Sequence, residues 1–222
     1  MTGPAWLSVL VKNLPYLWGG LQLTLGLSVV SIVLSFIFGT FLGMARLART
    51  AAVRWPATVY IELVRATPLI MVIFWIFFLL PIVTGRPIPP VQSALVAFVL
   101  FTSAYVAEIV RAGIQSVPKG QTEAALASGL SGWQVMQEVV LPQALTKMIP
   151  PLVGQFISLF KDTSLAYIIG VLELTRRATI VNNREFQSFA IFGFVAVVYF
   201  VFCYALSRSA RLLEARLAAG RR

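Results

Sequence analysis

The chain is 222 residues long, and 59% of its residues are hydrophobic while only 12% are charged. Soluble domains carry about a quarter charged residues, so this composition excludes an ordinary soluble domain and indicates a protein embedded in a membrane. The sequence has no histidine and one cysteine, which excludes histidine-based triads, histidine-ligated metals and an internal disulfide. It also lacks a glycine-rich phosphate loop. We therefore expect no catalytic residue, cofactor or metal in this chain.

Five apolar stretches follow one another along the chain, each long enough to cross a hydrocarbon core of about 30 Å. They predict an all-α integral membrane protein in which residues 1–222 form a single transmembrane domain. The expected helices run over about 19–44, 57–81, 91–114, 149–170 and 188–208. A soluble all-α protein is the alternative, but its helices would each need one polar face, and these are apolar all round.

The first and last predicted helices carry residues that suit a membrane and close helix contacts. Trp6, Tyr16 and Trp18 are typical of an interfacial segment that leads into the first helix. Small residues let helices approach closely. Those expected to serve contacts between two copies of the chain are Gly26, Ser28, Ser31, Ser35, Gly39 and Gly193.

The second and third predicted helices each contain a Glu-x-Val-Arg-Ala pattern. Glu62 with Arg65, and Glu108 with Arg111, place a carboxylate and a guanidinium on one helix face. One interpretation is that these paired charges anchor helix ends at the membrane boundary. For Glu108, which lies one turn deeper, lining a transport pathway is the other interpretation.

A polar segment between the third and fourth predicted helices, Glu123–Pro142, reads EAALASGLSGWQVMQEVVLP. Its alanine-rich start favours a short helix. Gly129 can end that helix in a left-handed cap, and Ser131 with Gln134 forms a capping box for a second helix. Pro142 is expected to weaken the continuation of the second helix. The segment is therefore predicted to be two short helices joined by a tight bend.

The fourth predicted helix is interrupted by charges at Lys161 and Asp162. If this helix starts near Ile149, Lys161 lies about 18 Å along it, close to the bilayer midplane. Charges at that depth are costly and usually face a bundle interior or a watery cavity. The alternative is that the two charges neutralise each other and serve only packing.

The functional interpretation of this segment is a polar site for a zwitterion. Asp162 would bind an ammonium group, while Lys161, Thr163 and Ser164 would donate hydrogen bonds to a carboxylate. Gln155 lies seven residues before Asp162, two helical turns away on the same face, and would contact the substrate side chain. Packing as a core polar residue is the alternative for Gln155.

The placement of lysine and arginine predicts the orientation. An outside N-terminus and a cytoplasmic C-terminus leave five cations outside, namely Lys12, Arg86, Arg176, Arg177 and Arg184. The same orientation leaves ten inside, namely Arg46, Arg49, Arg54, Lys119, Lys147, Arg208, Arg211, Arg216, Arg221 and Arg222. The net charge of +10 is thus expected to serve topology and contact with anionic lipid, not nucleic acid binding.

The segment Glu123–Pro142 also matches the pattern Glu-Ala-Ala, three residues, Gly, nine residues, an aliphatic residue, one residue, Leu-Pro. It resembles the EAA loop of the membrane-spanning subunits of ABC importers, although Val139 stands where that family usually has Ile. The resemblance implies the type I permease fold, with residues 115–148 as a cytoplasmic coupling loop between helices three and four. It implies contact with an ATPase through Glu123, Ala124, Ala125, Gly129, Leu141 and Pro142.

Three further segments, Glu62–Pro81, Ala104–Gly113 and Phe160–Thr175, resemble the permeases of polar amino acid importers. The resemblance implies a second permease copy (identical or sibling), two ATP-binding subunits that use the ATP, and an external solute-binding protein, in the bacterial inner membrane. Leu80–Pro89 looks most like permeases for glutamate and aspartate. Glutamine or a cationic amino acid is the alternative substrate. A stand-alone ion-coupled transporter or channel is the alternative class, but such proteins often carry two repeats in one chain.

Overall fold

The computed structural model describes residues 5–219, with the side chains of residues 6–212. Regular structure in that part of the chain is entirely helical, which confirms the all-α prediction. The elements are α1 (Ala5–Arg46), α2 (Ala51–Ala66), α3 (Leu69–Phe74), the π-helix η1 (Trp75–Leu79), α4 (Leu80–Thr84), α5 (Pro90–Gln115), α6 (Lys119–Ala127), α7 (Gly132–Gln134), the π-helix η2 (Val135–Val140), α8 (Leu141–Asp162), the 3-10 helix η3 (Thr163–Ile169), α9 (Leu174–Glu185) and α10 (Ser188–Ala219). Arg221, Arg222 and the side chain of Arg216 lie outside the described residues.

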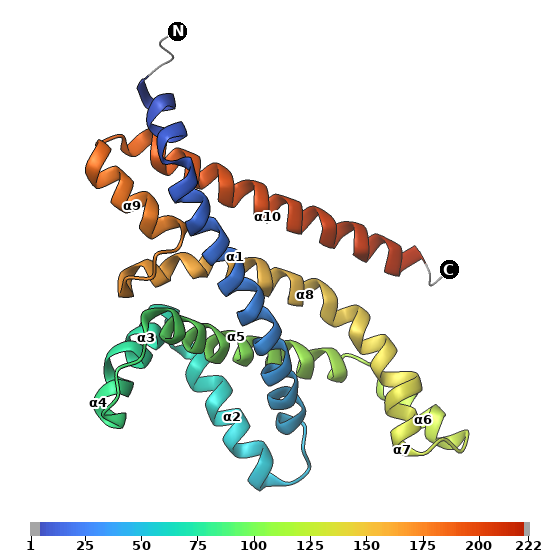
Figure 1. Ribbon diagram of the computed structural model, residues 1–222. Helices are drawn as coiled ribbons and strands as arrows, with labels where there is room; N and C mark the ends of the chain where they lie inside the picture. Colours follow the sequence, from blue (N-terminus) through green and yellow to red (C-terminus); the bar gives the residue numbers. More distant parts are fainter. Residues whose placement is uncertain (1–4, 220–222) are drawn as a thin grey trace.

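The helix α5 lies at the centre of the fold, where α1, α2, α3 and α8 pack against it (Figure 1). Its contact with α1 is close because glycines of α1 place no side chain between the two backbones. A Cβ at Gly39 would lie 2.5 Å from the Cβ of Val106, and one at Gly43 would lie 2.7 Å from the carbonyl oxygen of Ala107.

This packing changes the role expected for the small residues of α1. Ser28, Ser31, Ser35 and Gly39 are buried within the single chain, so they do not offer a surface to a second copy. Gly26 and Gly193 are exposed, and a Cβ at either would meet no atom within 4 Å. Only these two of the six expected positions therefore remain open to another chain.

The membrane spans follow the prediction in number, with one change of shape. Four helices in the described residues are long and apolar enough to cross a membrane, and the number reaches the predicted five if α2 with α3–α4, a pair bent by 109°, counts as one span. The sequence predicted a straight helix over 57–81. Pro68 explains the bend, because a proline disfavours helical conformation at the residue before it. Thr67 accordingly has extended angles, φ −103° and ψ 137°.

Several helix boundaries also differ from the prediction. The helix α1 begins at Ala5 instead of 19, so Trp6, Tyr16 and Trp18 belong to the helix itself and not to a segment before it. The helix α8 begins at Leu141 instead of 149, and α10 extends to Ala219 instead of 208. Because the midplane position of Lys161 was measured from a start at 149, helix length no longer supports that depth.

The sequence did not predict α9, which lies across α1 and the start of α10 (Figure 1). The carboxylate of Glu173 caps it by accepting hydrogen bonds from the backbone N–H groups of Thr175 (2.8 Å) and Arg176 (2.7 Å). Glu173 is fully buried, and this burial raises its pKa to about 7. The N–H of Leu174 donates to Thr24 Oγ1 at 3.2 Å, which ties the start of α9 to α1.

Candidate functional site

The predicted coupling segment has the local structure that its sequence indicates. Gly129 has φ +87° and closes α6 in a Schellman motif, in which its N–H donates to Leu126 O (3.0 Å) and that of Leu130 to Ala125 O (3.3 Å). Ser131 and Gln134 then form the capping box of the following helix. These bonds fix the angle between α6 and α7, so the segment forms a defined element. We call residues 119–140 the coupling element.

The coupling element continues into α8 in a way that the sequence did not predict. Pro142 was expected to weaken the helix, but the chain runs without a gap from the π-helix η2 into α8. A proline lacks the N–H that an α-helix needs at this position, and a π-turn accommodates such a defect without ending the helix. Figure 1 shows α6 and α7 at the end of α8 remote from α9.

The residues expected to contact a partner differ in exposure. Glu123, Ala124, Gly129, Leu141 and Pro142 are exposed. Ala125 is instead buried and packs in an apolar cluster with Val117, Val135, Val140, Ala144 and Met148. Its small side chain therefore attaches α6 to its own chain and leaves no surface for a partner.

Two apolar side chains on the coupling element were not among the predicted site residues. Trp133 is 69% exposed and Leu126 is 49% exposed. Large apolar side chains that project from a polar element mark an interaction surface. The signal of Trp133 was present in the sequence, because this residue lies two positions after Ser131, the capping residue of the second helix.

The charges of α1, α2 and α5 meet in one network. Arg46 donates to Glu62 Oε1 and to Glu108 Oε2, both at 2.7 Å, and so joins the three helices. Arg111 forms the predicted pair with Glu108, at 2.5 Å. Glu62 was expected to pair with Arg65, but the structure pairs it with Arg46, while Arg65 Nη1 lies 3.9 Å from Glu108 Oε2.

This network concerns the interpretation that Glu108 lines a transport pathway. Both oxygens of its carboxylate accept hydrogen bonds from arginines, so it is less available to a substrate ammonium. Glu108 does border a cavity of about 330 Å³, together with Ser116 and Lys147. The network itself could not be found from local spacing, because Arg46 lies 62 residues from Glu108.

The polar residues of α8 divide between two faces of the helix. Gln155 and Asp162 share one face, and both are half-buried. Lys161 is exposed, and the structure records no ion pair between it and Asp162. The charge of Lys161 still attracts the Asp162 carboxylate electrostatically, so the interpretation of the two as a self-neutralised pair remains an alternative. Ser164 is half-buried, while the hydroxyl of Thr163 is buried and donates to Phe160 O at 2.7 Å.

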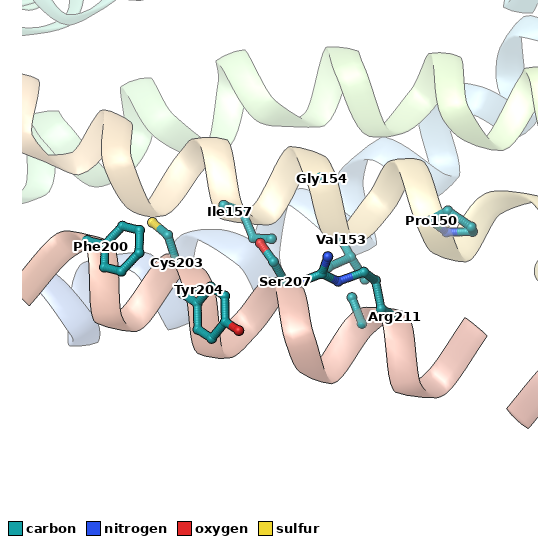
Figure 2. Close-up of a pocket in the computed structure, with 10 residues that line it drawn as sticks. Pro150, Val153, Gly154, Ile157, Phe200, Cys203, Tyr204, Ser207 and Arg211 are labelled. Carbon is teal, nitrogen blue, oxygen red and sulfur yellow. The ribbon is translucent and has the colours of Figure 1, made fainter. Parts of the chain in front are cut away.

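A cavity of about 530 Å³ lies between α8 and α10 (Figure 2). Its lining residues are Pro150, Val153, Gly154, Ile157, Phe200, Cys203, Tyr204, Ser207, Ala210 and Arg211. Figure 2 shows Ser207 and Arg211 extending from α10 towards α8. The spacing of Gly154 and Ile157 places Lys161 next along the same face of α8. None of Gln155, Asp162, Thr163 and Ser164 lines this cavity.

The coupling element and the bent spans point to the membrane subunit of an importer, and comparison with known proteins agrees. Residues 35–219 match the family of binding-protein-dependent transport system inner membrane components, and the chain belongs to this family. A crystal structure of an amino acid ABC transporter with histidines superposes with a TM-score of 0.90 at 33% identity. The match covers 97% of this chain and 100% of that one. The fold is therefore that of a type I ABC importer permease.

The curated relatives show which kind of importer permease this chain resembles. The probable glutamine ABC transporter permease GlnP of Bacillus subtilis (strain 168) is 43% identical over 208 residues, covering 92% of this chain and 95% of that protein. The glutamate/aspartate import permease GltK of Escherichia coli O6:H1 is 39% identical over 218 residues, covering 95% and 97%. The L-cystine permease TcyB of B. subtilis is 41% identical over 206 residues, covering 91% and 87%. The chain is thus an amino acid ABC transporter permease, within a group whose members differ in substrate.

Proposed function

We propose that this chain is the permease subunit of an ATP-driven importer for an acidic amino acid, glutamate or aspartate. It takes the substrate from an external binding protein and alternates between outward-open and inward-open states. ATP is hydrolysed on a separate subunit, which docks on the coupling element. The N-terminus lies outside and the C-terminus in the cytoplasm.

The observation that carries the transport role is the coupling element. It is held in one shape by its own capping bonds, and it presents Glu123, Leu126 and Trp133 to solvent at one end of the molecule. An exposed, rigid element with apolar side chains fits a groove on another subunit. A stand-alone transporter or channel has no use for such an element, so the ATP-driven role is the better account.

The acidic substrate is supported by the charges beside the cavity of Figure 2. Among the side chains that the structure describes, which end at residue 212, Arg211 lines it and no carboxylate does, and Lys161 follows on the same face of α8. Cations beside an apolar cavity favour an anionic ligand. The name of the relative GltK points the same way. Glutamine is the second candidate, because Gln155 is neutral and GlnP is named as a probable glutamine permease.

The complex is proposed to contain two permease copies, identical or sibling, with two ATP-binding subunits. The support is the polar face of α8. Gln155 and Asp162 are half-buried in the single chain, and a pathway needs this face to be shielded from lipid. A second bundle placed against α8 would shield it and enclose a pathway between the two copies.

The test is uptake by the native complex. Purification with untagged partners, followed by mass spectrometry, identifies the ATPase, the second permease and the binding protein. In proteoliposomes, glutamate or aspartate uptake should require both ATP and the binding protein, and should exceed arginine uptake. Arginine uptake without glutamate uptake would overturn the acidic substrate, and uptake without an ATPase would overturn the ATP-driven role.

A matched pair of variants tests the cationic cavity. Arg211→Met should lower glutamate uptake about fivefold with little effect on glutamine, because an acidic side chain loses one attractive charge. Arg208→Met removes a neighbouring exposed arginine of α10 that does not line the cavity, and should change neither. If the two variants had the same glutamate and glutamine uptake, the result would contradict the proposal that the substrate is acidic.

A further inference from the structure

The two ends of the coupling element are tied together by a lysine. Ser116 is the C-terminal cap of α5, directly before the coupling element, and Lys147 lies one residue short of Met148 in the first part of α8. Lys147 Nζ donates a hydrogen bond to the carbonyl oxygen of Ser116 at 2.7 Å. The two residues are 31 apart in sequence, so this bond closes the whole coupling segment at its base.

The bond is well suited to its place. The last four carbonyl groups of a helix have no partner within the helix, and they carry its negative dipole end. A lysine ammonium is therefore attracted to the end of α5 both as a donor and as a positive charge.

A second contact lies three residues before Ser116 on α5 and one residue after Lys147 on α8. A Cβ at Gly113 would collide with the side chain of Met148, so α5 and α8 touch here without a side chain on the α5 side. Val110, Val117, Val140 and Met148 share one apolar cluster beneath the coupling element. The ends of α5 and α8 are thus joined by a polar bond at the surface and an apolar contact below it.

We propose that Lys147 is a positioning residue for the coupling of ATP hydrolysis to transport. Its bond to Ser116 makes the ends of α5 and α8 move as one body when the ATPase displaces the coupling element. Without it, α6 can shift while α5 stays behind, and part of the displacement is lost. This inference rests on the proposed function, because it requires an ATPase on the coupling element.

The same geometry predicts that folding survives the loss of Lys147. Lys147 is exposed, and the Ser116 carbonyl it would leave behind is reached by water. The Gly113–Met148 contact and the apolar cluster do not depend on the ammonium. The effect should therefore appear in coupling, not in the amount of assembled complex.

The experiment compares three variants in the intact complex, reconstituted with its ATPase and binding protein. Lys147→Met removes the ammonium at similar size, and Lys147→Arg keeps a donor of positive charge. Lys12→Met is the control, since it removes an exposed lysine whose partner is Glu185, far from the coupling element in sequence. Uptake and ATP hydrolysis are measured in the same proteoliposomes. Hydrogen exchange of residues 111–118 is followed in the same preparations.

We expect Lys147→Met to lower uptake per ATP about fivefold while the hydrolysis rate stays near that of the wild type. Exchange at the end of α5 should become faster, and Lys147→Arg should recover most of the coupling.

Unchanged uptake per ATP in Lys147→Met would overturn the inference. Loss of assembly in that variant alone would also overturn it, by assigning Lys147 to folding. A wild-type complex without ATP-dependent uptake would instead overturn the proposed function, and the inference with it.

Discussion

The coupling element and the polar face of α8 follow each other directly along the chain, yet the polar groups of the two regions differ in whether they have partners within the chain. In the coupling element the C-terminal end of α6 and the N-terminal cap of α7 have their partners within a few residues, through Gly129 and the Ser131–Gln134 box. On α8, Gln155 and Asp162 are half-buried, and neither has a hydrogen-bond partner or ion pair described for its side chain. The polar groups at the caps of the coupling element are thus paired within the chain, whereas the polar side chains on this face of α8 are not.

This difference indicates which surfaces of the chain contact other molecules. A rigid element with all its bonds satisfied transmits a displacement without deforming. An open polar face in a membrane protein is stable only when something covers it, since exposure of a charge to lipid costs several kcal/mol or more. We infer that the coupling element acts as a solid body and that the face of α8 is completed by a second permease and by substrate. Four predictions test this contrast.

The largest expected effect is at Gly129, where Gly129→Asp should reduce uptake to background. A non-glycine residue in the left-handed region costs about 1–2 kcal/mol, and the new carboxylate would be buried unpaired on docking. The space around Gly129 is open, since a Cβ would meet no atom within 4 Å, so steric collision is not the cause. Uptake and co-purification of the ATPase are the measurements.

Gly129→Asn is the matched control for that variant. Asparagine tolerates the left-handed region better than most residues and adds no charge. It should therefore keep much of the uptake. If Gly129→Asp transported normally with the ATPase bound, the coupling element would not be the docking surface.

The next effect is at Asp162 on the open face. Asp162→Asn should weaken uptake of every amino acid by about tenfold or more, because the shared α-ammonium loses a charged partner worth about 1.5–3 kcal/mol. The measurement is the apparent KM for glutamate, glutamine and arginine. Lys161→Met, on a different face of α8, should alter the preference between substrates without weakening all of them. An unchanged KM in Asp162→Asn would remove this residue from the site.

The sequence predicted the coupling element well because its signals are local. Gly129, Ser131 and Gln134 act through bonds that reach no more than five residues, so spacing alone identifies them. The helix count was also predictable from hydrophobic length. Pro68 carried a signal for the bend of the second span, but the apolar run on both sides of it outweighed that signal in the prediction.

The features that the sequence could not predict depend on distant partners. Arg46 lies at the end of α1, and its bridge between Glu62 and Glu108 follows from how three helices pack. Lys147 looks like an ordinary surface lysine until the end of α5 is placed beside it. The role of the polar face of α8 is harder still to predict, because neither Gln155 nor Asp162 has a hydrogen-bond partner within the described residues.

The glycines of α1 also differ in whether they have a partner within the chain, since Gly39 packs against α5 and Gly26 has open space beside it. A measurement of stability can show this difference. Gly39→Ala should destabilise the protein by about 1–3 kcal/mol, because the added methyl overpacks the contact with Val106 on α5. Gly26→Ala has open space and should stabilise the purified protein by about 0.5–1 kcal/mol, because alanine is the better helix former. Thermal unfolding in detergent measures both. Equal stability of the two variants would show that α1 and α5 do not pack this closely.

The smallest expected effect is a change of preference at Gln155. It shares a helix face with Asp162, two turns away, so a bound amino acid held at Asp162 by its ammonium could extend its side chain to Gln155. Gln155→Glu places a negative charge there and should lower glutamate uptake about fivefold relative to glutamine. Gln155→Met is the control, because it removes the hydrogen bond without adding charge and should weaken both substrates alike. Uptake competition between the two amino acids gives the ratio directly. If Gln155→Glu changed both uptakes equally, Gln155 would not face the side chain of the substrate.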